Sequence, residues 1–177
     1  MLGHGAGGGV ETSDLGAAAR AARRVGFNVA LVEQPYRVAG RRSQPPARQL
    51  DAAWLAVIDQ LRHGVLTQLP LMVGGRSAGA RVACRTAGEV GAAAVLCLAF
   101  PLHPPGRADD PSKSRLSELE AVRVPVLVVQ GKSDPFGMPP PGPARKIVPV
   151  TGSHSLRSTD AIEAAVADWL HEWRPVR

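Results

Sequence analysis

The sequence has few aromatic residues, only two cysteines and no long apolar stretch. Phenylalanine, tryptophan and tyrosine make up 4% of the 177 residues, so side chains that could stack on nucleic acid bases are scarce. Cys84 and Cys97 lie in apolar surroundings without a CxxC pair or metal-ligand spacing, and we interpret them as reduced core thiols. The longest apolar run, around residues 91–102, is too short for a membrane span, and no signal peptide pattern opens the chain. We therefore expect a cytoplasmic protein without a membrane partner or a metal.

Acidic residues are fewer than basic ones, 15 against 21, which gives a formal net charge of +6. Such a balance can indicate a polyanionic partner such as nucleic acid. Here the basic residues are mostly arginines that stand singly or in pairs, such as Arg23-Arg24 and Arg41-Arg42, and they form no long basic run. We interpret this charge as a compositional bias and expect no nucleic acid partner.

The length and composition indicate one compact α/β domain over residues 1–177. Apolar residues make up 45% of the chain and charged residues 20%, which is typical of a globular protein. Short apolar runs alternate with segments of helical periodicity, as in a parallel sheet with helices on both faces. We expect strands over residues 27–32, 71–73, 93–98, 124–129 and 146–150, and helices over 15–25, 50–61, 78–87, 116–122 and 162–173.

One serine lies between a predicted strand and a predicted helix. The segment Gly75-Arg76-Ser77-Ala78-Gly79 has the pattern Gly-x-Ser-x-Gly. The pattern alone is a weak signal in a chain with 19 glycines, but the strand before it and the helix after it are the context of a nucleophile elbow. Small residues on either side let the strand and the helix approach each other. The turn would then present Ser77 at the helix N-terminus, where the amide of Ala78 can stabilise an oxyanion.

A serine hydroxyl becomes a good nucleophile when a base accepts its proton and a carboxylate orients that base. Asp134 follows the apolar run 126–129, and His154 follows the run 146–150. The carboxyl ends of parallel strands meet at one edge of the sheet, and Ser, Asp, His is the chain order of the α/β-hydrolases. Either residue alone could be a turn cap or a surface residue. Together they favour a catalytic triad of Ser77, Asp134 and His154.

The start of the chain is a candidate oxyanion loop. His4, Gly5 and Ala6 are followed by three glycines, which matches the HG-type loop whose amide would act with that of Ala78. A flexible tail and a phosphate-binding loop are the alternatives, although the Lys-Ser/Thr of a Walker motif and a helix-opening GxGxxG are absent. His4 and His103, which lies in the predicted loop 101–114, are weaker candidates for contacts to the substrate.

With these residues in place, the chain resembles the α/β-hydrolase superfamily. It looks most similar to small dienelactone-hydrolase-like proteins related to the testis-expressed and NSL-complex hydrolase-like proteins of animals. The resemblance implies a three-layer α/β-hydrolase fold with a mostly parallel sheet of about six strands. It also implies Ser77 as nucleophile, Asp134 as acid, His154 as base, and Ala6 and Ala78 as oxyanion donors. The matching segments are residues 3–8, 34–37, 74–82, 100–105, 130–137 and 152–154.

The N-terminal region departs from the superfamily pattern. Superfamily members usually carry two or more strands ahead of the HG loop, whereas only Met1 and Leu2 precede it here. Either the start lies upstream, or the sheet is trimmed. A trimmed sheet would leave an exposed edge that could support a homodimer, and it would hold the Ala6 amide less rigidly.

These observations favour a serine hydrolase that cleaves a small ester, thioester or related acyl bond through a Ser77 acyl-enzyme, without a cofactor. The short connection between residues 98 and 124 leaves little room for a large lid, so we expect an open site that accepts small acyl groups. A weak or inactive hydrolase-like scaffold for protein interaction is the alternative, but a scaffold has no physical need for Ser77, Asp134 and His154 together. Nucleic acid binding, which would depend strongly on salt, is the least favoured function.

Overall fold

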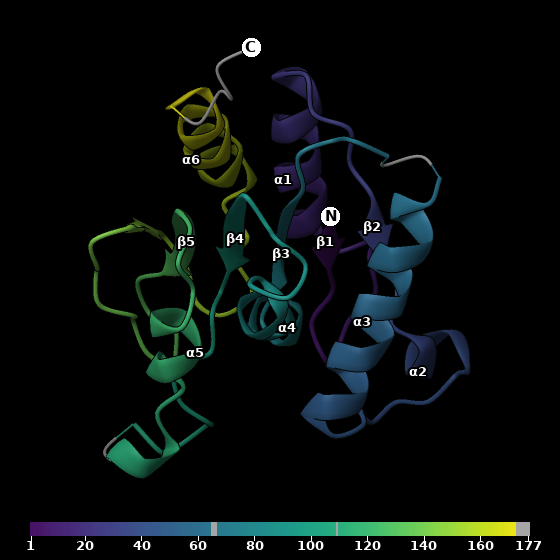
Figure 1. Ribbon diagram of the computed structural model, residues 1–177. Helices are drawn as coiled ribbons and strands as arrows, with labels where there is room; N and C mark the ends of the chain where they lie inside the picture. The colour runs from purple at the N-terminus through teal and green to yellow at the C-terminus, as the bar shows by residue number, and fades with distance from the viewer. Residues whose placement is uncertain (65–66, 109, 173–177) are drawn as a thin grey trace.

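The computed structural model describes residues 1–64, 67–108 and 110–172. Within these residues the strands form one six-stranded sheet in the order β2-β1-β3-β4-β5-β6, and each neighbouring pair is parallel. Helices cover both faces of this sheet (Figure 1). The strands are β1 (Leu2–Gly3), β2 (Leu31–Val32), β3 (Met72–Arg76), β4 (Ala94–Leu98), β5 (Val126–Gly131) and β6 (Arg145–Val150). The helices are α1 (Ser13–Arg24), α2 (Pro35–Val38), α3 (Ala47–Arg62), α4 (Ala78–Thr86), α5 (Leu116–Glu120) and α6 (Thr159–Glu172), with a 3-10 turn η1 (Pro111–Lys113).

Residues of the central strands alternate between two apolar cores. In β4, Leu96 and Leu98 belong to the core beneath α1 and α6, whereas Val95 and Cys97 belong to the core beneath α3, α4 and α5. An alternation with a period of two is the side-chain geometry of a strand. Because both faces are covered, β4 and most of β5 are apolar throughout, as in other buried parallel strands. The α/β fold with two helical layers that the sequence predicts is confirmed.

The helices pack through stripes that the sequence pattern predicts. In α3, Leu50, Trp54 and Ile58 repeat every four residues and are buried against the sheet. In α1, the buried residues include Ala17, Ala18 and Ala21, whose small side chains let the helix lie close to its neighbours. Between β4 and β5, the described residues contain only η1 and the short helix α5. This connection contains no large lid within the described residues, as predicted.

Some boundaries differ from the sequence prediction. The predicted strand 27–32 joins the sheet only at Leu31–Val32, because its neighbour β1 pairs over two residues. The short helix α2 was not predicted; its first residue is a proline, which suits the first turn of a helix. The terminal helix begins at Thr159, earlier than expected, and Trp173 of its predicted stripe lies outside the described residues. No helix in the described stretches combines the length and apolar character that a membrane crossing requires.

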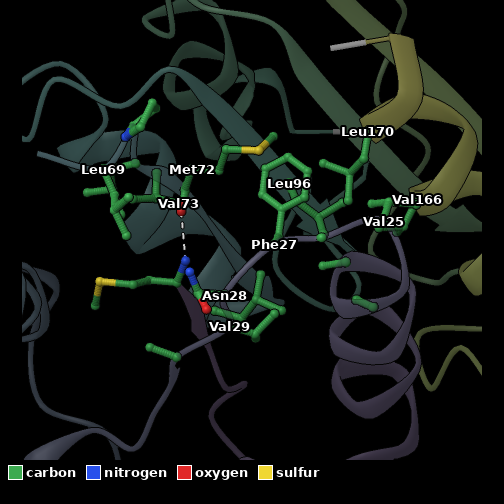
Figure 2. Close-up of a pocket in the computed structure, with 18 of the residues that line it drawn as sticks. Val25, Phe27, Asn28, Val29, Leu69, Met72, Val73, Leu96, Val166 and Leu170 are labelled. Carbon is green, nitrogen blue, oxygen red and sulfur yellow. Dashed lines mark hydrogen bonds between the residues drawn. The ribbon is translucent and has the colours of Figure 1, made fainter. Parts of the chain in front are cut away.

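A cavity of about 810 Å³ lies at the amino ends of β1 and β3. Its lining is mostly apolar and includes Phe27, Met72 and Leu96 (Figure 2). The Met1 amine donates a hydrogen bond to the Met72 carbonyl oxygen at 2.7 Å at this end of the sheet. Burial lowers the pKa of this amine to about 6. The predicted catalytic residues do not line this cavity, because they follow the carboxyl ends of their strands at the opposite edge of the sheet.

Candidate active site

Ser77 occupies the sharp turn between β3 and α4. Its backbone has φ 51° and ψ −108°, a combination that is rare and strained for a residue with a side chain. The Ser77 amide donates to the carbonyl oxygen of Leu98 at 2.9 Å, which ties the turn to the end of the neighbouring strand β4. A strained serine at a strand-to-helix turn is the geometry of a nucleophile elbow. The predicted strand-turn-helix context of Ser77 is therefore present.

Three glycines allow β1, β3 and α4 to meet beneath this turn. A Cβ atom on Gly75 would lie 2.8 Å from the carbonyl carbon of Gly79 and 3.0 Å from the amide nitrogen of Gly3. A Cβ atom on Gly79 would overlap the carbonyl oxygen of Gly3 and lie 2.8 Å from that of His4. These neighbours are backbone atoms, which cannot move aside as the end of a flexible side chain can. The requirement for small residues at positions 75 and 79 is confirmed.

His154 lies in the loop after β6 and contacts both of its predicted partners. Its Nε2 is 2.9 Å from the Ser77 Oγ, and its Nδ1 is 2.9 Å from the Asp134 Oδ2. The Asp134 side chain is 1% exposed and that of His154 is 17% exposed, so solvent and small molecules can reach the histidine. When Nδ1 donates its proton to the carboxylate, the lone pair of Nε2 faces the serine hydroxyl. This arrangement can remove the proton from Ser77.

The carboxylate of Asp134 is held by further donors. Its Oδ1 accepts the Phe136 amide at 2.9 Å, and its Oδ2 accepts the Gln130 Nε2 at 2.8 Å. Gln130 is fully buried, and its Nε2 also lies within hydrogen-bond distance of the carbonyl oxygens of Phe100 and Gly137. Sequence reasoning did not single out Gln130. A polar residue within the otherwise apolar run of β5 is the signal that could have identified it, because buried polar groups need partners.

Phe136 lies against the imidazole of His154. The two ring centroids are 4.2 Å apart, with planes inclined by 35°, so the aromatic ring limits the movement of the imidazole. The Phe136 carbonyl oxygen accepts the amide of His103 at 2.9 Å. The loop that carries His103 therefore packs against the turn that carries Asp134. A contact between His103 and the substrate remains a prediction.

The HG loop passes beside Ser77. A Cβ atom on Gly5 would lie 3.4 Å from the Ser77 Cβ, which is van der Waals contact, and 2.7 Å from Arg76 Nη1, so the backbone at Gly5 lies directly beside the nucleophile. The Tyr36 hydroxyl donates to the carbonyl oxygen of Ala6 at 3.2 Å and anchors the loop. Within the described residues, neither the Ala6 amide nor the Ala78 amide has a hydrogen-bond acceptor. Both amides are therefore free to bind a ligand.

The prediction that His4 contacts the substrate is wrong. His4 is 2% exposed. Its Nε2 accepts the Gln34 amide at 2.9 Å, which leaves the proton on Nδ1 for the 2.7 Å contact to the Gly5 carbonyl oxygen. Because both ring nitrogens are used inside the protein, His4 fixes the base of the HG loop and does not face the site.

A hollow of about 300 Å³ lies beside the elbow and is lined in part by Ala78, Leu50 and Arg81. Arg81 makes two hydrogen bonds, of 2.8 and 2.6 Å, to the carboxylate of Glu118. Arg85, which also lines the hollow, makes two hydrogen bonds of the same lengths to Asp51. Both guanidinium groups are thus compensated by carboxylates, and the hollow does not present a free cation from either of them.

Metal-binding clusters and reactive cysteines are absent among the described residues. Within the described residues there is no group of three or more His, Cys, Asp or Glu side chains that could hold a metal ion. Cys84 and Cys97 are both free and buried, with their sulfur atoms 3.5 Å apart. Hydrogen bonding to Cys84 and burial raise the pKa of Cys97 well above its ordinary value. The interpretation of both residues as reduced core thiols is confirmed.

Solved structures of hydrolases share this fold. A lidless α/β serine hydrolase from Xanthomonas campestris is 21% identical, with a TM-score of 0.76 and coverage of 99% of this chain and 83% of its own. Est1E from Butyrivibrio proteoclasticus, solved with ferulic acid bound, is 17% identical, with a TM-score of 0.72 and coverage of 97% and 87%. The monoacylglycerol lipase of Paleococcus ferrophilus is 14% identical, with a TM-score of 0.70 and coverage of 97% and 93%.

The sequence identities to these structures are low, so they establish a shared fold and not a shared substrate. No curated protein matches the sequence. The model of the alpha/beta hydrolase domain family, in contrast, matches residues 1–160, which include the elbow, the HG loop and the loops of Asp134 and His154. The chain therefore belongs to the alpha/beta hydrolase domain family.

Proposed function

We propose that this protein is a serine hydrolase that cleaves small ester, thioester or related acyl bonds through an acyl-enzyme on Ser77. The observation that carries the proposal is the pair of 2.9 Å contacts that link Ser77 Oγ, His154 and Asp134. A buried carboxylate, an imidazole and a hydroxyl in this order are the parts that activate a serine. We also propose that the protein is related to the small dienelactone-hydrolase-like proteins that its sequence resembles.

In the first half of the reaction, the Ser77 Oγ attacks the acyl carbonyl carbon while His154 Nε2 accepts the hydroxyl proton. The carbonyl oxygen becomes an oxyanion, which the amides of Ala6 and Ala78 would stabilise. The imidazolium then gives its proton to the leaving alcohol or thiol as the bond to it breaks. Asp134 stabilises the positive charge on His154 during this interval.

In the second half, water replaces the alcohol. His154 Nε2 accepts a proton from the water, whose oxygen attacks the acyl carbon of the Ser77 ester. The same two amides bind the second oxyanion. When this intermediate collapses, the imidazolium returns the proton to Ser77 Oγ, and the carboxylic acid product is released. Protons and charge balance without a metal or an organic cofactor.

We propose that the acyl group binds in the hollow beside Ala78, which favours small acyl groups. The hollow beside Ala78 has a volume of about 300 Å³, which is at the lower end of the range for small-molecule sites. The described residues between β4 and β5 contain no large lid that could enclose a long acyl chain. A lidless serine hydrolase and Est1E with bound ferulic acid share the fold, and these neighbours are compatible with a small, open site.

Steady-state hydrolysis of p-nitrophenyl acetate tests the proposal. We expect turnover by the wild-type protein and a loss of more than about 10³-fold in kcat for Ser77→Ala and for His154→Ala. Ser117→Ala is the matched control, because Ser117 is an exposed serine on α5. Equal rates for wild type and Ser77→Ala, with both proteins folded, would reject the acyl-enzyme and support the inactive scaffold for protein interaction.

A further inference from the structure

Arg76, the residue before the nucleophile, contacts the backbone of the loop that follows β6 and carries His154, residues 151–156, which we call the histidine loop. Its Nη2 donates to the carbonyl oxygen of His154 at 3.0 Å, and its Nε donates to the Oδ2 of Asp14 at 2.7 Å. The Arg76 side chain is 15% exposed and that of Asp14 is 2% exposed. One guanidinium therefore joins the first turn of α1 to the loop of the proposed base.

This contact adds a second connection between Ser77 and His154. The first is the side-chain contact between Oγ and Nε2. The second runs through the peptide bond from Ser77 to Arg76 and from the guanidinium to the His154 backbone. The contact to Asp134 fixes the imidazole from its side-chain end, and the contact from Arg76 fixes the backbone that carries it.

Other hydrogen bonds hold the neighbouring backbone of this loop: the Ser158 hydroxyl donates to the Thr151 carbonyl oxygen at 2.8 Å. The amide of Ser133 donates to the Gly152 carbonyl oxygen at 3.0 Å, and the Leu156 amide donates to that of Ser153 at 3.3 Å. Within the described residues, it is Arg76 that donates to the carbonyl oxygen of His154 itself. Removal of the Arg76 side chain would therefore release the backbone at the residue that must accept the proton.

Asp14 gives the guanidinium its orientation. Its Oδ1 accepts the amide of Leu15 at 2.9 Å, so the carboxylate is itself fixed at the start of α1. Its other oxygen binds the Nε of Arg76, which directs the far end of the fork toward His154. On the remaining side, a Cβ atom on Gly5 would lie 2.7 Å from Arg76 Nη1. The guanidinium is thus enclosed by α1, the HG loop and the histidine loop.

We propose that Arg76, held by Asp14, is a positioning residue that sets the alignment of His154 with Ser77. This inference rests on the proposed serine hydrolase function. Arginine is suited to the task because its planar fork offers donors at fixed spacing, and two of them reach two acceptors here. A lysine keeps the charge but offers one nitrogen, so it cannot reproduce both contacts in the same geometry.

The kinetic test compares Arg76→Lys and Asp14→Asn with the wild-type protein on p-nitrophenyl acetate. Because misalignment of the base affects the chemical step, we expect kcat to fall by about 10- to 100-fold while KM changes little. Arg20→Lys is the matched control: Arg20 lies on α1 and donates its Nε to Glu163 at 2.8 Å, but its side chain is 57% exposed. Unchanged kcat in Arg76→Lys would overturn the inference.

A double-mutant cycle separates positioning from a general effect on the fold. In a His154→Ala background, Arg76→Lys should change the residual rate by no more than about twofold, because the group through which Arg76 acts is absent. A loss as large as in the wild-type background would show that Arg76 does not act through His154 and would contradict the inference.

Hydrogen exchange gives a readout that does not require activity. We expect faster amide exchange over residues 151–156 in Arg76→Lys than in wild type, and no change there in Arg20→Lys. Unchanged exchange over this segment would overturn the positioning role even if the wild-type protein proves inactive. An inactive wild type with faster exchange in Arg76→Lys would instead reject the proposed hydrolase function and keep the structural connection.

Discussion

The carbonyl oxygen of Gly3 occupies the space into which a side chain on Gly79 would project. Gly3 belongs to β1, and Gly79 lies in the first turn of α4. Their contact sets how closely the helix that follows Ser77 approaches the sheet. The position of the nucleophile and the position of the HG loop therefore depend on the same pair of backbones.

Gly79→Ala should destabilise the protein and displace Ser77. The added methyl group would meet backbone atoms of Gly3 and His4, so the helix must move away, at a cost of about 1–3 kcal/mol in the free energy of unfolding. Denaturant unfolding measures this cost. Gly88→Ala is the control, because Gly88 is exposed and a Cβ atom there would meet no atom within 4 Å. Equal stability of the two variants would contradict the close packing of Gly79 against the Gly3 backbone.

Gln130→Leu should lower both stability and turnover. The substitution removes the Nε2 donor of Asp134 and leaves the buried Phe100 carbonyl oxygen without this partner. An unsatisfied buried acceptor costs about 1–3 kcal/mol, and a less constrained Asp134 would orient His154 less well. Thermal unfolding and kcat on p-nitrophenyl acetate measure the two effects. Gln60→Leu on the exposed side of α3 is the control; a similar loss in both variants would argue against a role for Gln130.

In protein prepared so that its chain begins at Met1, the buried amine should make stability depend on pH. Burial lowers the pKa of this amine from 8.0 to about 6, so the unfolded chain binds the proton more tightly. The free energy of unfolding should therefore fall by roughly 2 kcal/mol as the pH decreases from about 8 to about 6.

Urea unfolding across this pH range measures the change attributed to Met1. The same chain with Met1 acetylated is the control, because it cannot gain the proton but keeps every histidine. If both forms lose equal stability between these pH values, the amine is not the source of the effect.

Chain-length preference tests the size of the proposed acyl site. The hollow of about 300 Å³ beside Ala78, which we propose as the acyl site, accommodates an acetyl or butyryl group but not an extended palmitoyl chain. We expect kcat/KM on p-nitrophenyl esters to be highest for acetate or butyrate and to fall by at least about 10-fold for longer chains. Assays below the critical micelle concentration measure this series. A maximum at palmitate would contradict the small, open site.

Sequence patterns predicted the parts of the site that depend on strand order. Ser77, Asp134 and His154 each follow a strand of the parallel sheet, and parallel strands bring their carboxyl ends to one edge. The elbow was also predictable, because Gly75 and Gly79 meet a steric requirement that is local in sequence.

Contacts that depend on side-chain direction could not be predicted in this way. His4 was expected near the substrate, but its two ring nitrogens bind Gln34 and Gly5 inside the protein. The contacts of Arg76 with Asp14 and His154 span 62 and 78 residues, and no periodic pattern relates such positions. The length of β2 is likewise set by β1, with which it pairs over two residues, and not by the β propensity of residues 27–30.

The activation of Ser77 is measured most directly by the intact mass of the protein after reaction with a fluorophosphonate probe. We expect one adduct per chain on wild type, none on Ser77→Ala, and an unchanged adduct on Ser117→Ala. Absence of the adduct on folded wild-type protein, or an equal adduct on Ser77→Ala, would contradict an activated serine at this elbow.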